Sequence, residues 1–155
     1  MKQPVEFEDR IYSFGALFVA ANRIDTLLER SLEKFGVTSR QWFLSICVAH
    51  LFEKPPTLKE LAKASGTSYQ NVKQVALKLQ EKKLMSVRKD PIDARVTRIA
   101  MTPESETFWA QTDPDAQRFL DRLYQGISAE DLRVTRATLD QLLSNCDAME
   151  ERETV

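Results

Sequence analysis

The apolar residues between positions 58 and 102 change their spacing partway along the segment. In the first part they recur every three or four residues, which predicts two helices, over 58–64 and over about 69–83. In the second part apolar and polar residues alternate, which predicts two β-strands on either side of a charged turn at 90–93. The predicted order is therefore helix, turn, helix and hairpin.

The turn between the two predicted helices has the residues that a tight connection needs. Thr57 and Glu60 match a capping box that opens the first helix, and Gly66 supplies the positive φ of the turn. Either Thr67 or Ser68 can cap the second helix. This order is that of a winged helix-turn-helix, in which the second helix lies in the DNA major groove and the hairpin, or wing, reaches the backbone or the minor groove.

Long helices are predicted on both sides of this segment. Apolar residues at steps of three and four from Glu6 to Phe35 predict one amphipathic helix of roughly 40 Å, longer than a small domain is wide. Part of its apolar stripe needs cover from outside the local core, and a partner subunit is the simplest cover. Two more helices are predicted after position 102, and Pro114 should kink or break the first of them.

We therefore predict a mainly α fold with a small β-hairpin wing. It is a winged helix-turn-helix with long N- and C-terminal dimerisation helices. The 155 residues leave little room for two independent domains. We expect one domain over 1–155, with dimerisation helices at 1–37 and 103–155 and a winged helix-turn-helix DNA-binding lobe at 38–102.

The charges are unevenly distributed along the chain. The net charge of the whole sequence is −1, but Lys59 to Arg98 carries ten basic and four acidic residues, a net charge of +6. The remaining 115 residues therefore carry −7. A basic segment with acidic flanks is typical of a nucleic-acid reader on a neutral or acidic frame.

The outward face of the second helix of the motif carries the side chains that could read bases. Asn and Gln can pair with adenine through two hydrogen bonds, and Lys reaches guanine acceptors or phosphate. The alternative is an ordinary solvated polar face. The candidate residues on this helix are Ser68, Gln70, Asn71, Lys73 and Gln74.

Residues 93–102 resemble the wing signature of the multiple-antibiotic-resistance-regulator (MarR) family. Asp93-Ala94-Arg95 looks like the family's D-x-R element, and the run that follows ends in Met101-Thr102, where the family has leucine-threonine. The approach to the wing, from Leu79 to Leu84 and at Asp90-Pro91, matches as well. Lys83, where many relatives have glycine, and Pro114 depart from the family pattern.

The resemblance implies a role for each residue of the wing. Arg95 would enter or border the minor groove, and Asp93 would hold its guanidinium in a charge-assisted pair. The alternative is an exposed ion pair in a hairpin turn. Arg88 and Lys89 suit contacts with DNA phosphates, or else they are merely solvated.

Members of this family commonly respond to small aromatic or anionic ligands bound between the dimer arms and the DNA-reading lobe. Aromatic residues at helical spacing are, however, more often plain core than ligand contacts. The residues that could line such a pocket are Phe14, Phe18, Arg23, Trp42, Phe43, His50 and Trp109.

Other classes of protein have less support. Two cysteines, expected to be free thiols, and one histidine cannot form a four-ligand zinc site or an iron–sulfur cluster, so we expect no metal and no cofactor. The catalytic motifs of common enzyme classes are missing, so we do not expect an enzyme. No apolar run approaches membrane-spanning length, so we expect a cytoplasmic protein without a membrane partner.

The expected function is that of a duplex-DNA-binding transcriptional regulator. We expect a homodimer that binds a palindromic operator as a ligand-responsive repressor. The alternative is a winged-helix protein-interaction module without DNA binding, for which the same hydrophobic framework would serve. Steep weakening of DNA binding by salt would distinguish the two, because phosphate contacts release counterions.

Overall fold

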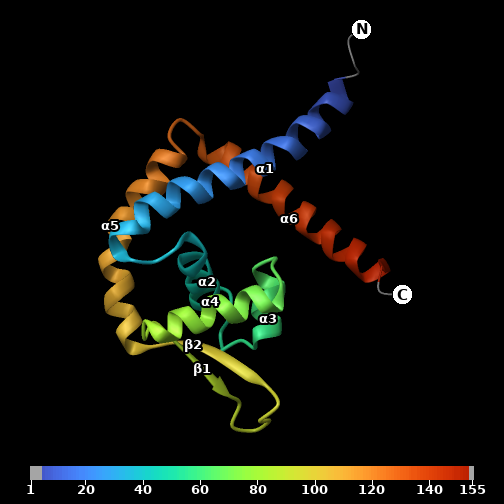
Figure 1. Ribbon diagram of the computed structural model, residues 1–155. Coiled ribbons are helices and arrows are strands. Elements are labelled where there is room, and N and C mark those ends of the chain that lie inside the picture. The colour runs from blue at the N-terminus through green and yellow to red at the C-terminus, as the bar shows by residue number, and fades with distance from the viewer. Residues whose placement is uncertain (1–4, 154–155) are drawn as a thin grey trace. The chain divides into compact units, whose positions relative to one another are not determined.

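The computed structural model describes residues 5–153 and confirms a mainly α fold with a β-hairpin wing (Figure 1). It forms two compact units, one up to Phe119 and one from Leu120 onward. The described elements are α1 (Val5–Leu32), η1 (Glu33–Phe35), α2 (Ser39–His50), α3 (Leu58–Ala64), α4 (Tyr69–Glu81), β1 (Met85–Lys89), β2 (Thr97–Met101), α5 (Pro103–Leu123) and α6 (Ala129–Glu153).

Capping contacts and glycines fix the helix starts and turns of the lobe, and those of α3 and α4 lie where the sequence predicts them. Thr38 and Thr57 each form a complete capping box, with Gln41 and Glu60 respectively, at the first residues of α2 and α3. Of the two residues that could cap α4, Ser68 does so. Gly36 and Gly66 adopt φ of 67° and 62°, which a side chain would disfavour. These local contacts fix where each helix of the lobe begins.

The core of the first unit lies between α2, α3, α4 and the hairpin. Leu61, Ala76, Leu79 and Ile99 are fully buried there. The strands pair antiparallel, from Met85 opposite Met101 to Lys89 opposite Thr97. Figure 1 shows the hairpin extending beyond the helices, with its turn at the free end. The lobe therefore holds one end of the wing and leaves the other end exposed.

At the end of α4, Lys83 occupies the position where many MarR-family proteins have glycine. The helix ends at Glu81, two residues before the expected end, and Lys83 itself adopts φ of 62°. Such a conformation is uncommon for a residue with a side chain, so the surroundings must stabilise it. The Leu84 N–H donates to the Leu79 carbonyl at 2.9 Å, and the Thr102 hydroxyl donates to the Lys83 carbonyl at 2.6 Å. The exit from α4 therefore keeps a left-handed residue without glycine.

Pro114 does not break α5, although the sequence predicts a kink or a break there. The helix runs from Pro103 to Leu123 without interruption. Proline removes one backbone donor, and contacts on either side of it support the helix here. The Thr112 hydroxyl donates to the Trp109 carbonyl at 2.9 Å, and Lys34 Nζ of η1 lies 2.7 Å from Asp115 Oδ2.

The described part of α1 leaves much of its apolar stripe uncovered. Only its last turns reach the core, through the buried Leu28 and Leu32. Phe14 and Phe18 pack edge to face with ring centroids 5.0 Å apart, yet both are exposed. The exposed apolar residues of this helix are Ile11, Tyr12, Phe14, Leu17, Phe18, Val19 and Leu27.

The second unit consists of the end of α5 and the long helix α6. Gly126 turns the chain with φ of 82°, and the Ser128 hydroxyl accepts from the Asp131 N–H at 3.0 Å to cap α6. Exposed apolar side chains follow along this helix: Leu132, Val134, Leu139, Leu142, Leu143 and Met149. Among residues 5–153, no helix has the length and apolar character needed to cross a membrane.

Candidate nucleic-acid interface

One face of α4 is buried and the opposite face carries the five candidate residues. Val72, Ala76 and Leu79 hold the buried face against the core, as their three- and four-residue spacing requires. The exposed face carries Ser68, Gln70, Asn71, Lys73 and Gln74. The structure thus brings all five to one solvent-facing surface, which we call the reading face.

Two residues of the reading face also stabilise the start of α4. The Ser68 hydroxyl accepts from the Asn71 N–H at 3.2 Å, and Asn71 Nδ2 donates to the Thr67 hydroxyl at 3.2 Å. Gln70 and Gln74 make no side-chain hydrogen bond within the part of the chain that is described. Their amides are therefore available to an external partner. The free N–H groups at this end of the helix also favour a phosphate.

The other end of α4 is attached to the junction between η1 and α2. Lys82 Nζ donates to the Gly36 carbonyl and, at 3.1 Å, to Gln41 Oε1. Gln41 is buried and closes the capping box of α2. The reading face therefore belongs to a helix that is capped at its start and bonded to the junction between η1 and α2 at its end.

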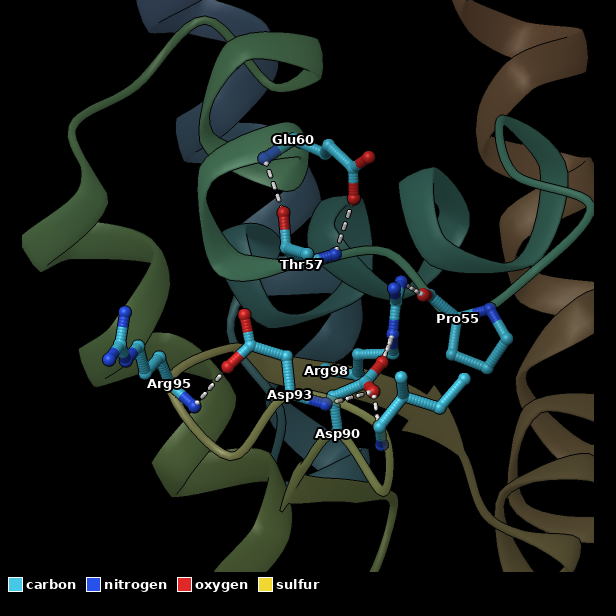
Figure 2. Close-up of polar contacts among 8 residues, drawn as sticks. Pro55, Thr57, Glu60, Asp90, Asp93, Arg95 and Arg98 are labelled. Carbon is cyan, nitrogen blue, oxygen red and sulfur yellow. Dashed lines mark hydrogen bonds and ion pairs between the residues drawn. The ribbon is translucent and has the colours of Figure 1, made fainter.

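The wing carries its predicted basic residues on the surface, but the expected pair between Asp93 and Arg95 is wrong. Arg88, Lys89 and Arg95 are exposed. Asp93 Oδ1 accepts from the backbone N–H of Arg95 at 3.0 Å, and Figure 2 shows the Arg95 guanidinium turned away from that carboxylate. The side chain of an aspartate in a turn is short. It therefore accepts from the backbone N–H two residues later more readily than from the guanidinium at the end of a long arginine side chain. The Arg95 guanidinium is thereby left to face solvent.

The ion pair of the wing is formed by Asp90 and Arg98, which the sequence reasoning missed. Asp90 Oδ1 accepts from the N–H groups of Ile92, at 2.8 Å, and Asp93, at 3.1 Å. Its other oxygen pairs with Arg98 Nε, and Arg98 Nη1 donates to the Pro55 carbonyl at 2.9 Å. The Asp-Pro sequence signals the aspartate turn. Nothing in the sequence signals that Arg98 meets Pro55.

These contacts keep the Asp90 carboxylate charged. The hydrogen bond from Arg98, followed by those from Ile92 and Asp93, lowers the pKa of Asp90 to about 2. A lowered carboxyl pKa stabilises the fold above the ordinary value of 3.8, and that stabilisation is lost as the pH falls toward 2. With a pKa of about 2, the Asp90 carboxylate is ionised at neutral pH and can pair with Arg98.

A cavity of about 690 Å³ lies between the end of α1, the start of α2 and α4, which we call the reading helix. Its walls include Asp25 and Glu29 of α1 and Asn71 and Gln74 of the reading face. The Ser39 hydroxyl donates to Asp25 and the Ser39 N–H to Glu29, both at 2.6 Å. Both carboxylates therefore already accept hydrogen bonds from the first residue of α2.

The seven candidate pocket residues do not line this cavity together. Phe43 is the one that does. Trp42 and Trp109 are partly buried against the core, whereas Phe14, Phe18, Arg23 and His50 are exposed. Burial raises the pKa of the Cys47 thiol, which opposes thiolate reactivity, and both Cys47 and Cys146 are free.

The architecture is shared with solved structures of MarR-family regulators. AbsC, a MarR-family transcriptional regulator from Streptomyces coelicolor, has a TM-score of 0.78 at 14% identity, over 96% of this chain and 99% of that one. A mutant MarR from E. coli complexed with operator DNA has a TM-score of 0.74 at 17% identity, over 91% of this chain and 99% of that one.

A third similar structure concerns a regulator and its ligand. It is BpsR from Bordetella bronchiseptica, whose DNA binding is regulated by 6-hydroxynicotinic acid, with a TM-score of 0.69 at 22% identity, over 86% of this chain and 98% of that one. No protein-family model and no curated protein matches the sequence. The order of the elements and these superpositions together show that the chain has the winged-helix fold of MarR-family transcriptional regulators.

Proposed function

We propose that this protein is a transcriptional regulator that binds duplex DNA in a sequence-specific manner. The observation that carries the proposal is the exposed reading face of α4 together with the exposed Arg95 guanidinium in the wing turn. Both lie in the segment from Lys59 to Arg98, which carries a net charge of +6. Helix α4 would lie in the major groove, and Arg95 would enter or border the minor groove beside it.

Individual residues would divide into those that read bases and those that contact the backbone. Gln70 and Asn71 present amides that suit adenine, and Lys73 and Gln74 extend the same face. Ser68 would remain chiefly a cap, because its hydroxyl already accepts a hydrogen bond. In the wing, Arg88 and Lys89 would contact phosphates, and Asp93 would shape the turn that presents Arg95.

The test is selection of bound fragments from a random duplex pool, followed by salt titration of the selected duplex. We expect a recurring sequence whose binding weakens steeply as salt rises, because phosphate contacts release counterions. The control is an unrelated duplex of equal length, which should bind more weakly at each salt concentration. Failure to select any sequence, with no salt-sensitive complex, would instead favour a winged-helix protein-interaction module.

The protein would act as a homodimer whose arms are residues 1–37 and 103–155. The exposed apolar stripe of α1 needs a cover, and a second copy supplies an equivalent stripe. Two reading heads related by a two-fold axis imply a palindromic operator with half-sites about 34 Å apart. The protein would be cytoplasmic. A dimer bound at a promoter would block transcription, so we expect repression rather than activation.

Phe18→Asp is expected to convert the dimer to a monomer at micromolar concentration. The ring is 61% exposed in the single chain, and burying a carboxylate in its place at an interface is unfavourable. Sedimentation velocity measures the change directly. Leu51→Asp, at a site 58% exposed outside the arms, is the matched control and should leave the dimer intact. A wild-type monomer under these conditions would contradict the homodimer.

A small aromatic or anionic effector would bind near Trp109 and change the spacing of the two heads. The indole Nε1 of Trp109 is buried and has no hydrogen-bond partner among the described residues. A buried donor without an acceptor is unusual, and an anionic or carbonyl oxygen of a ligand would satisfy it. Such a ligand would favour a distance between the two DNA-binding lobes of the dimer at which their α4 helices no longer fit successive major grooves.

A further inference from the structure

Arg98 joins three parts of the lobe that are separate in the sequence. Its Nε pairs with the Asp90 carboxylate of the wing turn, and its Nη1 donates to the Pro55 carbonyl in the segment between α2 and α3 (Figure 2). The backbone follows the same path, because Thr57 forms a β-bridge with Arg98 and the Ile99 N–H donates to the Pro56 carbonyl at 2.9 Å. We call the two side-chain contacts of Arg98 the clamp.

The clamp lies beside the start of the helix-turn-helix. Thr57 is the N-cap of α3, and its capping partner is Glu60. The pKa of Arg98 is raised, chiefly by its hydrogen bond with Asp90 and to a smaller extent by the charge of Glu60. Through Pro55, Arg98 therefore reaches the segment that leads directly into α3. Helix α3 in turn packs on α4, which carries the reading face. The clamp thus connects the wing to the helix that supports the reading helix.

The wing tip, residues 91–95, depends on polar contacts for its position. All five residues are exposed, and Ile92 is 95% exposed, so the tip has no apolar packing of its own. Backbone bonds from Asp90 to Val96 and from Val96 to Asp93 close the turn on itself. They do not join it to the helices. From the lobe, a chain of contacts runs through Arg98 and Asp90 to the N–H groups of the tip, and through Asp93 to Arg95.

We propose that Arg98 is a positioning residue, which through Asp90 fixes the wing tip and its Arg95 at a set distance from α3 and α4. The proposal rests on the proposed DNA-binding function. A protein that reads the major groove with α4 and the neighbouring minor groove with Arg95 must hold both elements in one register with the duplex. The Arg98 side chain is 41% exposed and the Asp90 side chain is 9% exposed, so the clamp lies at the surface end of the lobe, where the wing turn begins.

The first test measures how Asp90→Asn changes the affinity for the selected duplex. A positioning role predicts weaker binding, whereas the loss of a negative charge by itself predicts tighter binding. Removing a negative charge near DNA should tighten binding if charge alone matters. The clamp instead predicts about tenfold weaker binding to the selected duplex, at the low end of the cost of one lost DNA contact. Glu81→Gln, which removes an exposed charge at the end of α4, is the matched control and should bind at least as tightly as the wild type. Equal or tighter binding by Asp90→Asn would overturn the proposal.

The second test is a double-mutant cycle with Arg98→Met and Arg95→Ala. If Arg98 positions Arg95, the loss caused by Arg95→Ala should shrink to about twofold in the Arg98→Met background, because the two residues act through one contact chain. Additive losses would show that Arg98 acts as a separate charge, and they would overturn the proposal. Arg98→Lys keeps the charge but cannot serve both acceptors, so it should restore only part of the affinity.

The third measurement needs no DNA and separates this proposal from the proposed function. Amide hydrogen exchange of Ile92 and Asp93 should be faster in Arg98→Met than in the wild type, because both N–H groups donate to the carboxylate that Arg98 holds. Circular dichroism checks that the variant is folded. Unchanged exchange would overturn the clamp. A wild-type protein that binds no duplex at any salt concentration would overturn the proposed function instead.

Discussion

Leu79→Ala is expected to lower the free energy of unfolding by about 3 to 4 kcal/mol, within the range for a buried leucine that leaves a cavity. Leu79 of α4 is 0% exposed and lies in the core with Leu61 and Ile99. The three residues belong to one hydrophobic core cluster, which joins α4 to α3 and to the wing. Urea denaturation followed by circular dichroism, at one fixed protein concentration, measures the loss.

The same helix contains a matched control for this substitution. Leu77 is 40% exposed, and Leu77→Ala should cost less than about 1 kcal/mol because little apolar surface is returned to water. The pair differs in burial but shares residue type and helix. Equal losses at the two positions would contradict the buried face assigned to α4.

Arg95→Ala is expected to weaken binding of the selected duplex by about 100-fold, a loss within the range of one specific contact. The Arg95 backbone N–H is held by Asp93, while its guanidinium is exposed and free to enter a narrow minor groove, where the potential is most negative. The variant should unfold as the wild type does, because the Arg95 side chain is exposed. Fluorescence anisotropy at physiological salt measures the affinity.

Two further variants separate the role of Arg95 from that of positive charge. Arg133→Ala removes an equally charged residue whose side chain is 70% exposed on α6, and it should bind nearly as the wild type does. Lys89→Ala, at an expected phosphate contact, should weaken binding about equally on all sequences. Unchanged affinity of Arg95→Ala would remove the wing from the mechanism.

The expected and observed wing turns show which contacts sequence reasoning can find. Asp93 was expected to hold the Arg95 guanidinium, but a neighbouring backbone N–H competes for the same carboxylate and lies closer. Asp90, one residue before a proline, is the aspartate that organises the turn. Its cation is Arg98, which lies on the second strand. The sequence therefore correctly predicted a wing turn rich in charged residues, but it did not predict which aspartate pairs with which arginine.

Pro114 shows the same limit in a helix. The local rule for proline predicts a kink or a break, and the helix nevertheless continues to Leu123. The ion pair between Lys34 and Asp115 comes from a residue about eighty positions earlier in the chain, so no local rule includes it. Tertiary contacts of this kind decide whether a locally disfavoured residue interrupts an element.

The sequence by itself determined the order of the elements, the helix starts and the face of α4 that is buried. The reason is that capping boxes such as Thr57 with Glu60, and apolar stripes, join residues three or four positions apart, whose geometry follows from the helix alone. Only the tertiary structure decided that Arg98 meets Pro55 and that Lys82 meets Gly36. Those partners lie more than forty residues apart, so they come together only after the core has brought α2, α4 and the wing into contact.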